Sequence, residues 1–272
     1  MNKLKAIKLF VIATLLGSPS VQAKNETVSW KWFDAVATQI DKTPDRAGGS
    51  KQEKLMADWI EQHWQAMGYS VKRMPFSYSL RKTNFNSENL SIDLKGQSDN
   101  IIVVGAHYDS VGIKSGSEGL IDNGSGVAAL LALAEMLKPH VENKTLPVSV
   151  RLVTFGAEER GLQGARDYIN REDIQRDKII GMINLDTIVG GDKLYVHSAH
   201  ESPYSCKGVK DANSSSDATL RDQLKAISDR LYPNNPHLLH PATKGYPKGQ
   251  TGSWSDHALF ACAGIPIVYL EA

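Results

Sequence analysis

Residues 101–109 read Ile-Ile-Val-Val-Gly-Ala-His-Tyr-Asp, and this stretch decides the expected fold. Its first six residues form a continuous apolar run of strand length, which is typical of a strand buried on both faces, as in a parallel sheet. His107 and Asp109 follow the run, and alternate residues of an extended chain point to the same side. The pair suits either a structural His–Asp contact or a histidine metal ligand whose ring is oriented by the carboxylate.

The segments that flank this stretch alternate between helical and strand patterns. We expect helices at 52–67, 124–137, 161–170, 217–231 and 255–263, strands at 148–155, 179–185 and 265–270, and a strand and turn within 81–97. Pro139 lies beyond the expected end of the second helix. Such alternation predicts an α/β fold with a mixed, largely parallel central sheet and helices on both faces. In sheets of this kind, ligands bind at the carboxyl ends of the strands.

Acidic residues stand where these strands are expected to end. Asp122 opens the turn Asp-Asn-Gly-Ser-Gly ahead of a helix, so it either caps that helix or bridges two cations. Glu158 and Glu159 follow strand 148–155. They either begin a solvated helix or lie beside a multivalent cation that offsets their repulsion; if extended, they would point apart. Asp186 follows strand 179–185 as a turn former or a ligand.

These residues together favour a metal site at one edge of the sheet. Imidazole and carboxylate ligands suit zinc or a similar divalent ion. Three or more carboxylates around one histidine exceed the need of a single tetrahedral zinc. The sequence therefore predicts two metal ions, about 3.5–4 Å apart.

Three further segments complete an ordered set of motifs that runs from about Gln52 to the C-terminus. They are Gly-Asp-Lys-Leu-Tyr at 191–195, Tyr-Pro-Lys-Gly at 246–249 and Ala-Gly-Ile-Pro at 263–266. With this set, the chain resembles the M28 family of metallopeptidases, and within it the bacterial alkaline-phosphatase isozyme-conversion aminopeptidases. The resemblance implies the α/β fold of zinc exopeptidases.

The resemblance also implies a role for each acidic residue. His107 and Asp186 would hold one zinc ion, Glu159 would hold the other, Asp122 would bridge them, Asp109 would orient His107, and Glu158 would be the general base that takes a proton from the metal-bridging water. The peptide bond between Asp122 and Asn123 would be cis, as it often is in the family.

One ligand of the family has no counterpart in the chain. The fifth ligand is a histidine in a segment after the Gly-Ile-Pro strand, whereas this sequence stops at Ala272. His257, in the Ser-Asp-His stretch, is a candidate substitute. We therefore expect either a C-terminally truncated relative or a second zinc site that binds its ion weakly.

The expected activity is removal of single residues from the N-termini of peptides or proteins. The alternatives are a carboxypeptidase or glutaminyl-cyclase-like enzyme on the same scaffold, and a metal-poor homologue that only binds. The likeness suggests Arg or Lys as the residue removed, although the sequence assigns no acid to hold such a cation. Trp254 and Tyr246 are candidates for lining the substrate pocket.

The N-terminus has the layout of a secretory signal peptide. Lys3, Lys5 and Lys8 precede an apolar run, Leu9 to Leu16, that is too short to span a bilayer, and Val-Gln-Ala at 21–23 fits a cleavage site. We expect a signal peptide at 1–23 and the catalytic domain at 24–272. The mature chain should have no membrane span and should lie in the periplasm or outside the cell.

Charge and cysteine content bear on the expected partners and on disulfide formation. The chain has 31 Lys and Arg residues against 30 Asp and Glu, without a basic stripe, so nucleic acid is not an expected partner. Cys206 and Cys262 are the only cysteines. In an exported protein they either form one disulfide or remain as core residues.

Overall fold

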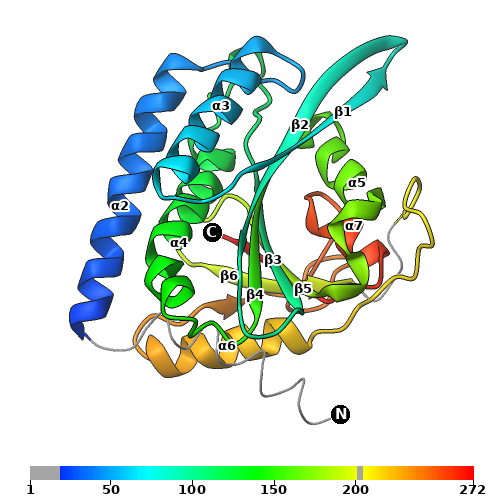
Figure 1. Cartoon of the computed structure of the whole chain (residues 1–272). Coiled ribbons are helices and arrows are strands. Elements are labelled where there is room, and N and C mark those ends of the chain that lie inside the picture. Colours follow the sequence, from blue (N-terminus) through cyan, green and yellow to red (C-terminus); the bar gives the residue numbers. More distant parts are fainter. Residues whose placement is uncertain (1–18, 201–204) are drawn as a thin grey trace.

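A mixed β-sheet forms the centre of the computed structural model, which describes residues 19–200 and 205–272 (Figure 1). In this part of the chain the sheet has nine strands, in the order β1-β2-β4-β3-β5-β9-β6-β7, with β8 paired to β6. The strands are β1 (Lys72–Leu80), β2 (Thr83–Leu94), β3 (Ile101–His107), β4 (Ser149–Phe155), β5 (Ile179–Leu185), β6 (Tyr195–Ala199), β7 (Leu238–Leu239), β8 (Gln250–Thr251) and β9 (Ile267–Glu271). The central four, β4-β3-β5-β9, are parallel, while β1, β2 and β6 run antiparallel to their neighbours β2, β4 and β9.

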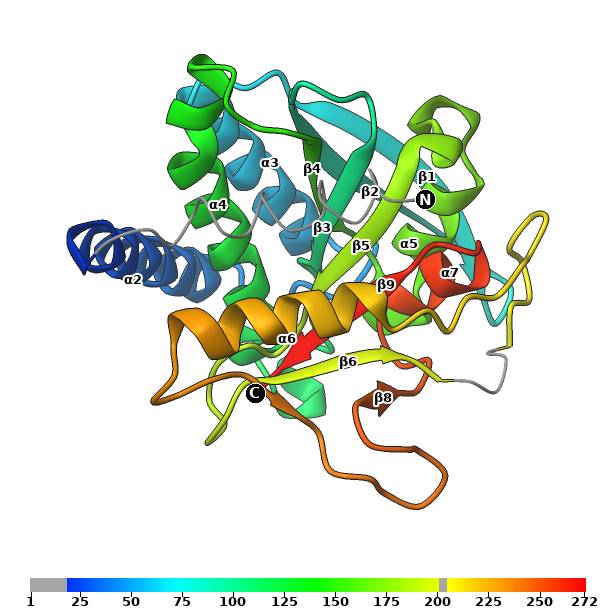
Figure 2. The same ribbon diagram turned by 90° about the horizontal axis from the view of Figure 1, so that it is seen from below.

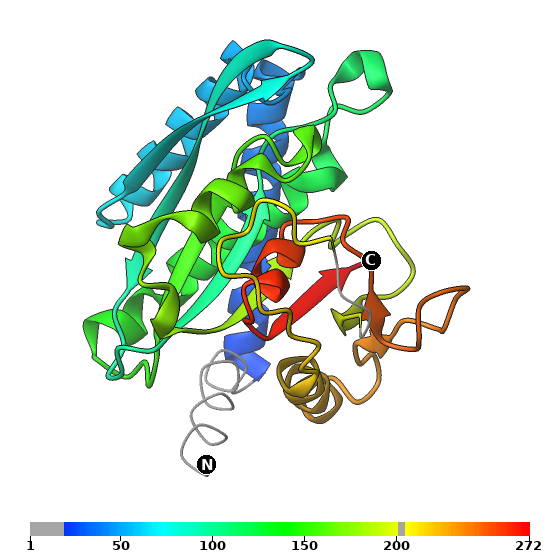
Figure 3. The same ribbon diagram turned by 90° about the vertical axis from the view of Figure 1, so that its right-hand side faces the viewer.

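Helices cover both faces of the sheet, which confirms the predicted fold class (Figures 1, 2 and 3). One face carries α2 (Pro19–Lys42), α3 (Lys51–Ala66), α4 (Ser125–Glu142) and α6 (Thr219–Leu231), and the other carries α5 (Gln163–Asn170) and α7 (His257–Cys262). Short 3₁₀ turns at Ile113–Ser115, Glu158–Arg160, Glu172–Ile174 and Arg176–Lys178 connect these elements.

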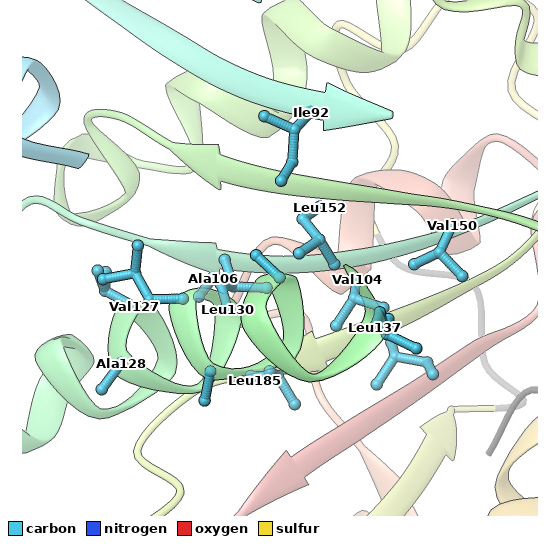
Figure 4. Close-up of a cluster of buried hydrophobic side chains, with 14 of the residues drawn as sticks. Ile92, Val104, Ala106, Val127, Ala128, Leu130, Leu137, Val150, Leu152 and Leu185 are labelled. Atoms are coloured by element: carbon cyan, nitrogen blue, oxygen red, sulfur yellow. The ribbon is translucent and has the colours of Figure 1, made fainter. Parts of the chain in front are cut away.

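The alternation of side chains along β3 divides the core into two layers. Val104 and Ala106 pack with Leu130, Leu137 and other residues of α4 on one face (Figure 4). Val103 belongs to the second layer, under α5 and α7. Each buried Val, Leu or Ile side chain contributes about 1.5–3 kcal/mol. Because both faces of β3 are covered in this way, its apolar run is continuous.

Proline explains two differences from the sequence prediction. Helix α4 continues through Pro139 to Glu142, beyond the predicted end at residue 137. A proline removes one backbone hydrogen bond, and here it does so near the end of a long helix that is held by core packing. Strand β1 was not predicted; it contains Pro75 and lies at the sheet edge, where a missing backbone donor is tolerated. Helix α2 and strand β6 were also missed.

Helix α4 is also apolar enough to raise the question of a membrane span. Among the described residues, one helical stretch, Leu120–Glu142, is long and apolar enough to cross a bilayer. Of its most apolar part, 61% is buried inside the protein. It therefore serves as a core helix of the α/β fold. Residues 1–18 of the predicted signal peptide lie outside the described part of the chain, and residues 19–23 begin α2.

The two cysteines form a disulfide. Cys206 and Cys262 are bonded, with their Cα atoms 5.4 Å apart. The bond joins the segment before α6 to the end of α7. The alternative of two separate core thiols is therefore wrong.

Candidate metal centre

The carboxyl ends of β3, β4 and β5 bring the predicted site residues together. His107 is the last residue of β3, Glu158 lies in the turn after β4, and Asp186 directly follows β5. Nε2 of His107 lies 3.0 Å from Oδ1 of Asp122, 3.5 Å from Oδ1 of Asp186 and 3.9 Å from Oε2 of Glu158. Residues far apart in the sequence thus direct their polar atoms at one point.

The donor atoms at this point suit a metal ion. His107, Glu158 and Asp186 are buried, and each offers a ligand atom within 4.8 Å of the other two. In the described part of the chain, neither these carboxylates nor that of Asp122 form an ion pair with a lysine or arginine. Buried carboxylates without a cation are costly, and a divalent ion would offset that cost. Imidazole and carboxylate donors fit zinc.

The protonation of the site reflects this surplus of acid. Burial alone would lower the pKa of His107, but the charges of Glu158 and Asp186 outweigh it and raise the pKa above its ordinary value. Burial raises the pKa of Glu158 well above its ordinary value, and raises that of Glu159 to about 7. The geometry therefore concentrates negative charge that the protein interior does not neutralise by itself.

Asp109 connects the end of β3 to the glutamate turn. Its Oδ1 accepts a hydrogen bond from the backbone N–H of Glu158 (2.9 Å), and its Oδ2 accepts one from that of Glu159 (3.2 Å). Oδ1 also lies 3.5 Å from Nδ1 of His107, beyond a good hydrogen bond. Asp109 thus holds the turn that carries the two glutamates and lies beside the imidazole of His107.

The two glutamates lie in a 3₁₀ turn, Glu158–Arg160, that follows Ala157 in the left-handed region (φ 53°). The segment is not extended, so the expectation that the two glutamates point apart does not apply. Glu158 is buried and belongs to the group with His107 and Asp186. Glu159 is partly buried, and its Oε1 is buried without a hydrogen-bond partner among the described residues. Glu159 is therefore not one of the three residues whose ligand atoms lie within 4.8 Å of one another, although its charge acts on the same histidine.

Asp122 approaches His107 from a turn at the start of α4. The Asp122–Asn123 peptide bond is cis, as the resemblance implied. Asn123 takes the role of a cap: its Oδ1 accepts from the N–H of Gly126 (3.0 Å), and its Nδ2 donates to the carbonyl of Leu185 (2.9 Å). The capping interpretation of Asp122 is therefore wrong, and its half-exposed carboxylate faces His107 instead.

Gly126 allows this turn to lie close to the sheet. A Cβ at position 126 would come within 2.6 Å of the Leu185 carbonyl and 2.8 Å of the Ala106 Cβ. The first turn of α4 therefore packs directly against β3 and β5, which places Asp122 beside the residues at their ends.

Sequence reasoning missed the residues that hold Asp186. Ser255 donates from Oγ to Oδ2 of Asp186 (2.7 Å) and accepts from Nδ2 of Asn184 (2.7 Å), while Thr187 donates to Oδ1 (3.1 Å). Burial raises the pKa of Asp186, but the charge of His107 and these hydrogen bonds outweigh it and lower the pKa to about 2. A serine ahead of a helix is usually a cap, and this common role hides the contact of Ser255 with Asp186 in the sequence.

His257 does not join the group around His107 in the described structure. Its Nε2 lies 2.9 Å from the carbonyl oxygen of Gly252, and its ring stacks on Tyr269 at 4.7 Å. Burial lowers the pKa of His257 to about 4. The neighbouring Asp256 is fully buried, and neither of its carboxylate oxygens has a hydrogen-bond partner among the described residues. Trp254 is about half exposed and packs edge-on against Tyr246.

Comparison with known proteins agrees with this architecture. Residues 89–272 match the model of peptidase family M28. The chain is 30% identical over 253 residues to the alkaline phosphatase isozyme conversion protein of Escherichia coli, a match that covers 84% of this chain and 68% of that protein. Other similar proteins are named aminopeptidases.

Solved structures share the fold at low sequence identity. A glutaminyl cyclase from Porphyromonas gingivalis superposes with a TM-score of 0.68 at 18% identity, covering 89% of this chain and 82% of that one. A zinc aminopeptidase from Bacillus subtilis superposes with a TM-score of 0.67 at 16% identity, covering 89% and 84%.

Proposed function

The chain belongs to peptidase family M28, and we propose that it is a zinc-dependent aminopeptidase that removes single residues from the N-termini of peptides or proteins. The observation that carries the proposal is the convergence of Asp122, Glu158 and Asp186 on Nε2 of His107, at 3.0, 3.9 and 3.5 Å. A buried imidazole among carboxylates at the carboxyl ends of parallel strands is suited to metal-assisted hydrolysis.

The residues divide into ligands and acid–base groups. His107 and Asp186 would hold one zinc ion, Glu159 a second, and Asp122 would bridge the two. When bound, the ions supply Lewis acidity, which polarises the scissile carbonyl and makes water easier to deprotonate. Ser255 and Thr187 fix the carboxylate of Asp186 by hydrogen bonds, so this ligand needs little reorganisation.

Glu158 is the proposed general base. Burial raises the pKa of its carboxyl group, which strengthens it as a proton acceptor. It would take a proton from the attacking water and deliver it to the leaving amine. Asp109 accepts a hydrogen bond from the backbone N–H of Glu158 and lies 3.5 Å from Nδ1 of His107. It would keep the general base and the metal ligand in fixed positions relative to each other.

The similar proteins favour a substrate with a free amine. Two of them are named aminopeptidases, which supports removal of an N-terminal residue over a carboxypeptidase on the same scaffold.

The test combines metal analysis with a blocked substrate. Zinc per chain is measured by elemental analysis, and hydrolysis is followed with a panel of aminoacyl anilides and with the same compounds acetylated at the amine. We expect zinc-dependent release from the free amines only. Equal turnover of acetylated and free compounds would refute the aminopeptidase assignment.

A glutaminyl-cyclase-like activity is the second candidate, and the fold shared with the Porphyromonas gingivalis enzyme supports it. A peptide with N-terminal glutamine separates the two. An aminopeptidase releases free glutamine and shortens the peptide, whereas a cyclase releases ammonia and leaves the peptide the same length with a cyclised end.

We further propose that the protein is exported and acts in the periplasm or outside the cell. The Cys206–Cys262 disulfide supports this location, because such bonds persist in oxidising compartments. Cell fractionation and N-terminal sequencing of the mature protein test it. The expected first residue is Lys24.

A further inference from the structure

Arg46 is a completely buried arginine in the segment between α2 and α3, behind the metal centre. It lies outside residues 89–272, which match the family model. Its guanidinium donates from Nε to the carbonyl of Tyr108 (3.0 Å), from Nη1 to that of Glu118 (2.8 Å) and from Nη2 to that of Gly119 (2.9 Å). One side chain therefore uses three donors on three carbonyls.

These carbonyls belong to the two loops that carry site residues. Tyr108 lies between His107 and Asp109, and the backbone carbonyl of Arg46 accepts a further hydrogen bond from the N–H of Ser110 (3.2 Å). Glu118 and Gly119 lead into the turn that presents Asp122. Arg46 thus ties the loop after β3 to the loop before α4.

The environment of Arg46 distinguishes it from a structural ion pair. No carboxylate lies within ion-pair distance of its guanidinium among the residues that the structure describes. Burial lowers the pKa of Arg46 to about 10, and the charges of Asp109 and Asp122 oppose that effect. A buried charge needs compensation, and here the acids of the metal centre supply it through space. The planar fork of a guanidinium suits three fixed acceptors, which a lysine ammonium does not match.

We propose that Arg46 is a positioning residue for the metal centre: its three hydrogen bonds fix the Asp109 loop and the Asp122 turn relative to each other, so that His107 and Asp122 meet without reorganisation. The inference rests on the proposed function in naming zinc as the ion and in the expected loss of turnover. Loss of the three hydrogen bonds of Arg46 should lower the affinity for zinc, and should lower kcat with little change in KM.

The first test compares two buried arginines. Arg46→Lys keeps the charge but cannot reach all three carbonyls. Arg151→Lys is the matched control, because Arg151 is also buried and bonds to Asp93 and the carbonyl of Ile174, away from the site. Zinc affinity is measured by titrating the metal-free proteins against a chromophoric chelator. We expect roughly a tenfold loss or more for Arg46→Lys and less than about a twofold change for Arg151→Lys, in line with the effect of groups that orient metal ligands.

A second pair of variants leaves Arg46 in place, in case Arg46→Lys does not fold. A Cβ at Gly119 would lie 2.7 Å from Nη2 of Arg46, 2.7 Å from Cβ of Ser110 and 2.8 Å from the carbonyl oxygen of Asp122. One at Gly116 would meet nothing within 4 Å, and both residues have positive φ (73° and 92°). Gly119→Ala and Gly116→Ala therefore share backbone strain, but only Gly119→Ala disturbs the junction at which Arg46 joins the two loops. We expect only Gly119→Ala to lower zinc affinity.

The outcomes separate this inference from the proposed function. Wild-type zinc affinity in a folded Arg46→Lys protein, or equal losses in both members of either pair, would overturn the positioning role. A wild-type protein that binds zinc but hydrolyses no anilide would refute the aminopeptidase and leave the inference on Arg46 testable by affinity alone. A wild-type protein that binds no zinc would refute both.

Discussion

Replacing Glu53 by glutamine tests how a buried carboxylate supports the glutamate turn. Glu53 lies in the first turn of α3, where Ser50 caps the helix. Its Oε2 accepts from the N–H of Gly49 (2.6 Å), and its Oε1 accepts from Oγ of Ser87 (2.7 Å) and the N–H of Ala157 (2.9 Å). Through Ala157 it holds the residue that precedes Glu158.

The pKa shift of Glu53 gives the size of the expected change in the free energy of unfolding. Burial and then the charge of Asp109 raise this pKa from 4.5 to about 8, although the three hydrogen bonds lower it. The folded protein therefore holds the proton more tightly than the unfolded chain. The resulting stability is complete below pH 4.5 and is lost as pH rises through about 8. At about 1.4 kcal/mol per pH unit, the full loss is about 5 kcal/mol.

The amide introduced by Glu53→Gln cannot ionise, so the variant lacks this loss. Its NH2 group cannot accept a hydrogen bond, so either the N–H of Gly49 or that of Ala157 loses its acceptor. Urea unfolding of metal-free, oxidised wild type and Glu53→Gln is measured from about pH 5 to about pH 9, a range that spans the titration. We expect the variant to be the less stable protein at the acid end, by about 1–3 kcal/mol for the unsatisfied backbone donor. Towards the alkaline end the wild type should lose several kcal/mol relative to the variant. Titrating groups that do not interact with Glu53 are common to both proteins and cancel in the difference. Parallel curves would refute the reasoning, and Glu142→Gln, on the surface of α4, provides the control.

Three further outcomes are expected. Glu158→Gln should retain zinc by elemental analysis and lose turnover by about 10²–10⁴-fold, the usual contribution of a general base, and undiminished turnover would remove Glu158 from that role. Asp122→Ala should lower zinc content at both positions, whereas a full complement of zinc would contradict the bridging role. Ser255→Ala should destabilise the protein by about 1.5–3 kcal/mol at neutral pH, measured by urea unfolding, because it removes a hydrogen bond to the buried carboxylate of Asp186. Since the pKa of Asp186 is lowered from 3.8 to about 2, that loss should fade as pH falls through this interval, and a loss independent of pH would argue against it.

The sequence predicted the parallel centre of the sheet, and the placing of candidate site residues at the carboxyl ends of its strands, because both depend on local signals. The apolar run before His107 predicts a buried strand, and parallel strands place their carboxyl ends at one edge wherever the helices between them lie. Strand 179–185 was predicted with the bounds that the structure shows. The position of Asp186 beside His107 then follows from the pairing of β3 with β5.

The contacts behind the site could not be predicted in the same way. Arg46 and Glu53 reach backbone atoms 62 to 104 residues away, and a backbone acceptor or donor leaves no pattern in the sequence. An arginine and a glutamate near the start of a helix are, by composition, ordinary surface residues. Only the fold shows that the segment from 46 to 53 lies beneath both loops of the metal centre.

The charge balance of the centre leads to a last prediction, on metal removal. Six carboxylates lie near one imidazole: Asp109, Asp122, Glu158, Glu159, Asp186 and Asp256. Burial raises the pKa of Glu158 and Asp256, and that of Glu159 from 4.5 to about 7, so the metal-free folded protein binds protons that the unfolded chain releases. The stability of the metal-free protein should therefore fall as pH rises from 4.5 through about 7.

A bound divalent cation removes this dependence, because it replaces those protons and favours ionised carboxylates. The zinc-loaded protein should keep its melting temperature between about pH 5 and pH 8, while the chelator-treated protein loses stability over the same range. Zinc affinity should accordingly rise with pH. If loaded and stripped proteins instead changed in parallel, the acids around His107 would not be the groups that bind the ion, and the assignment of this cluster as the metal centre would fail.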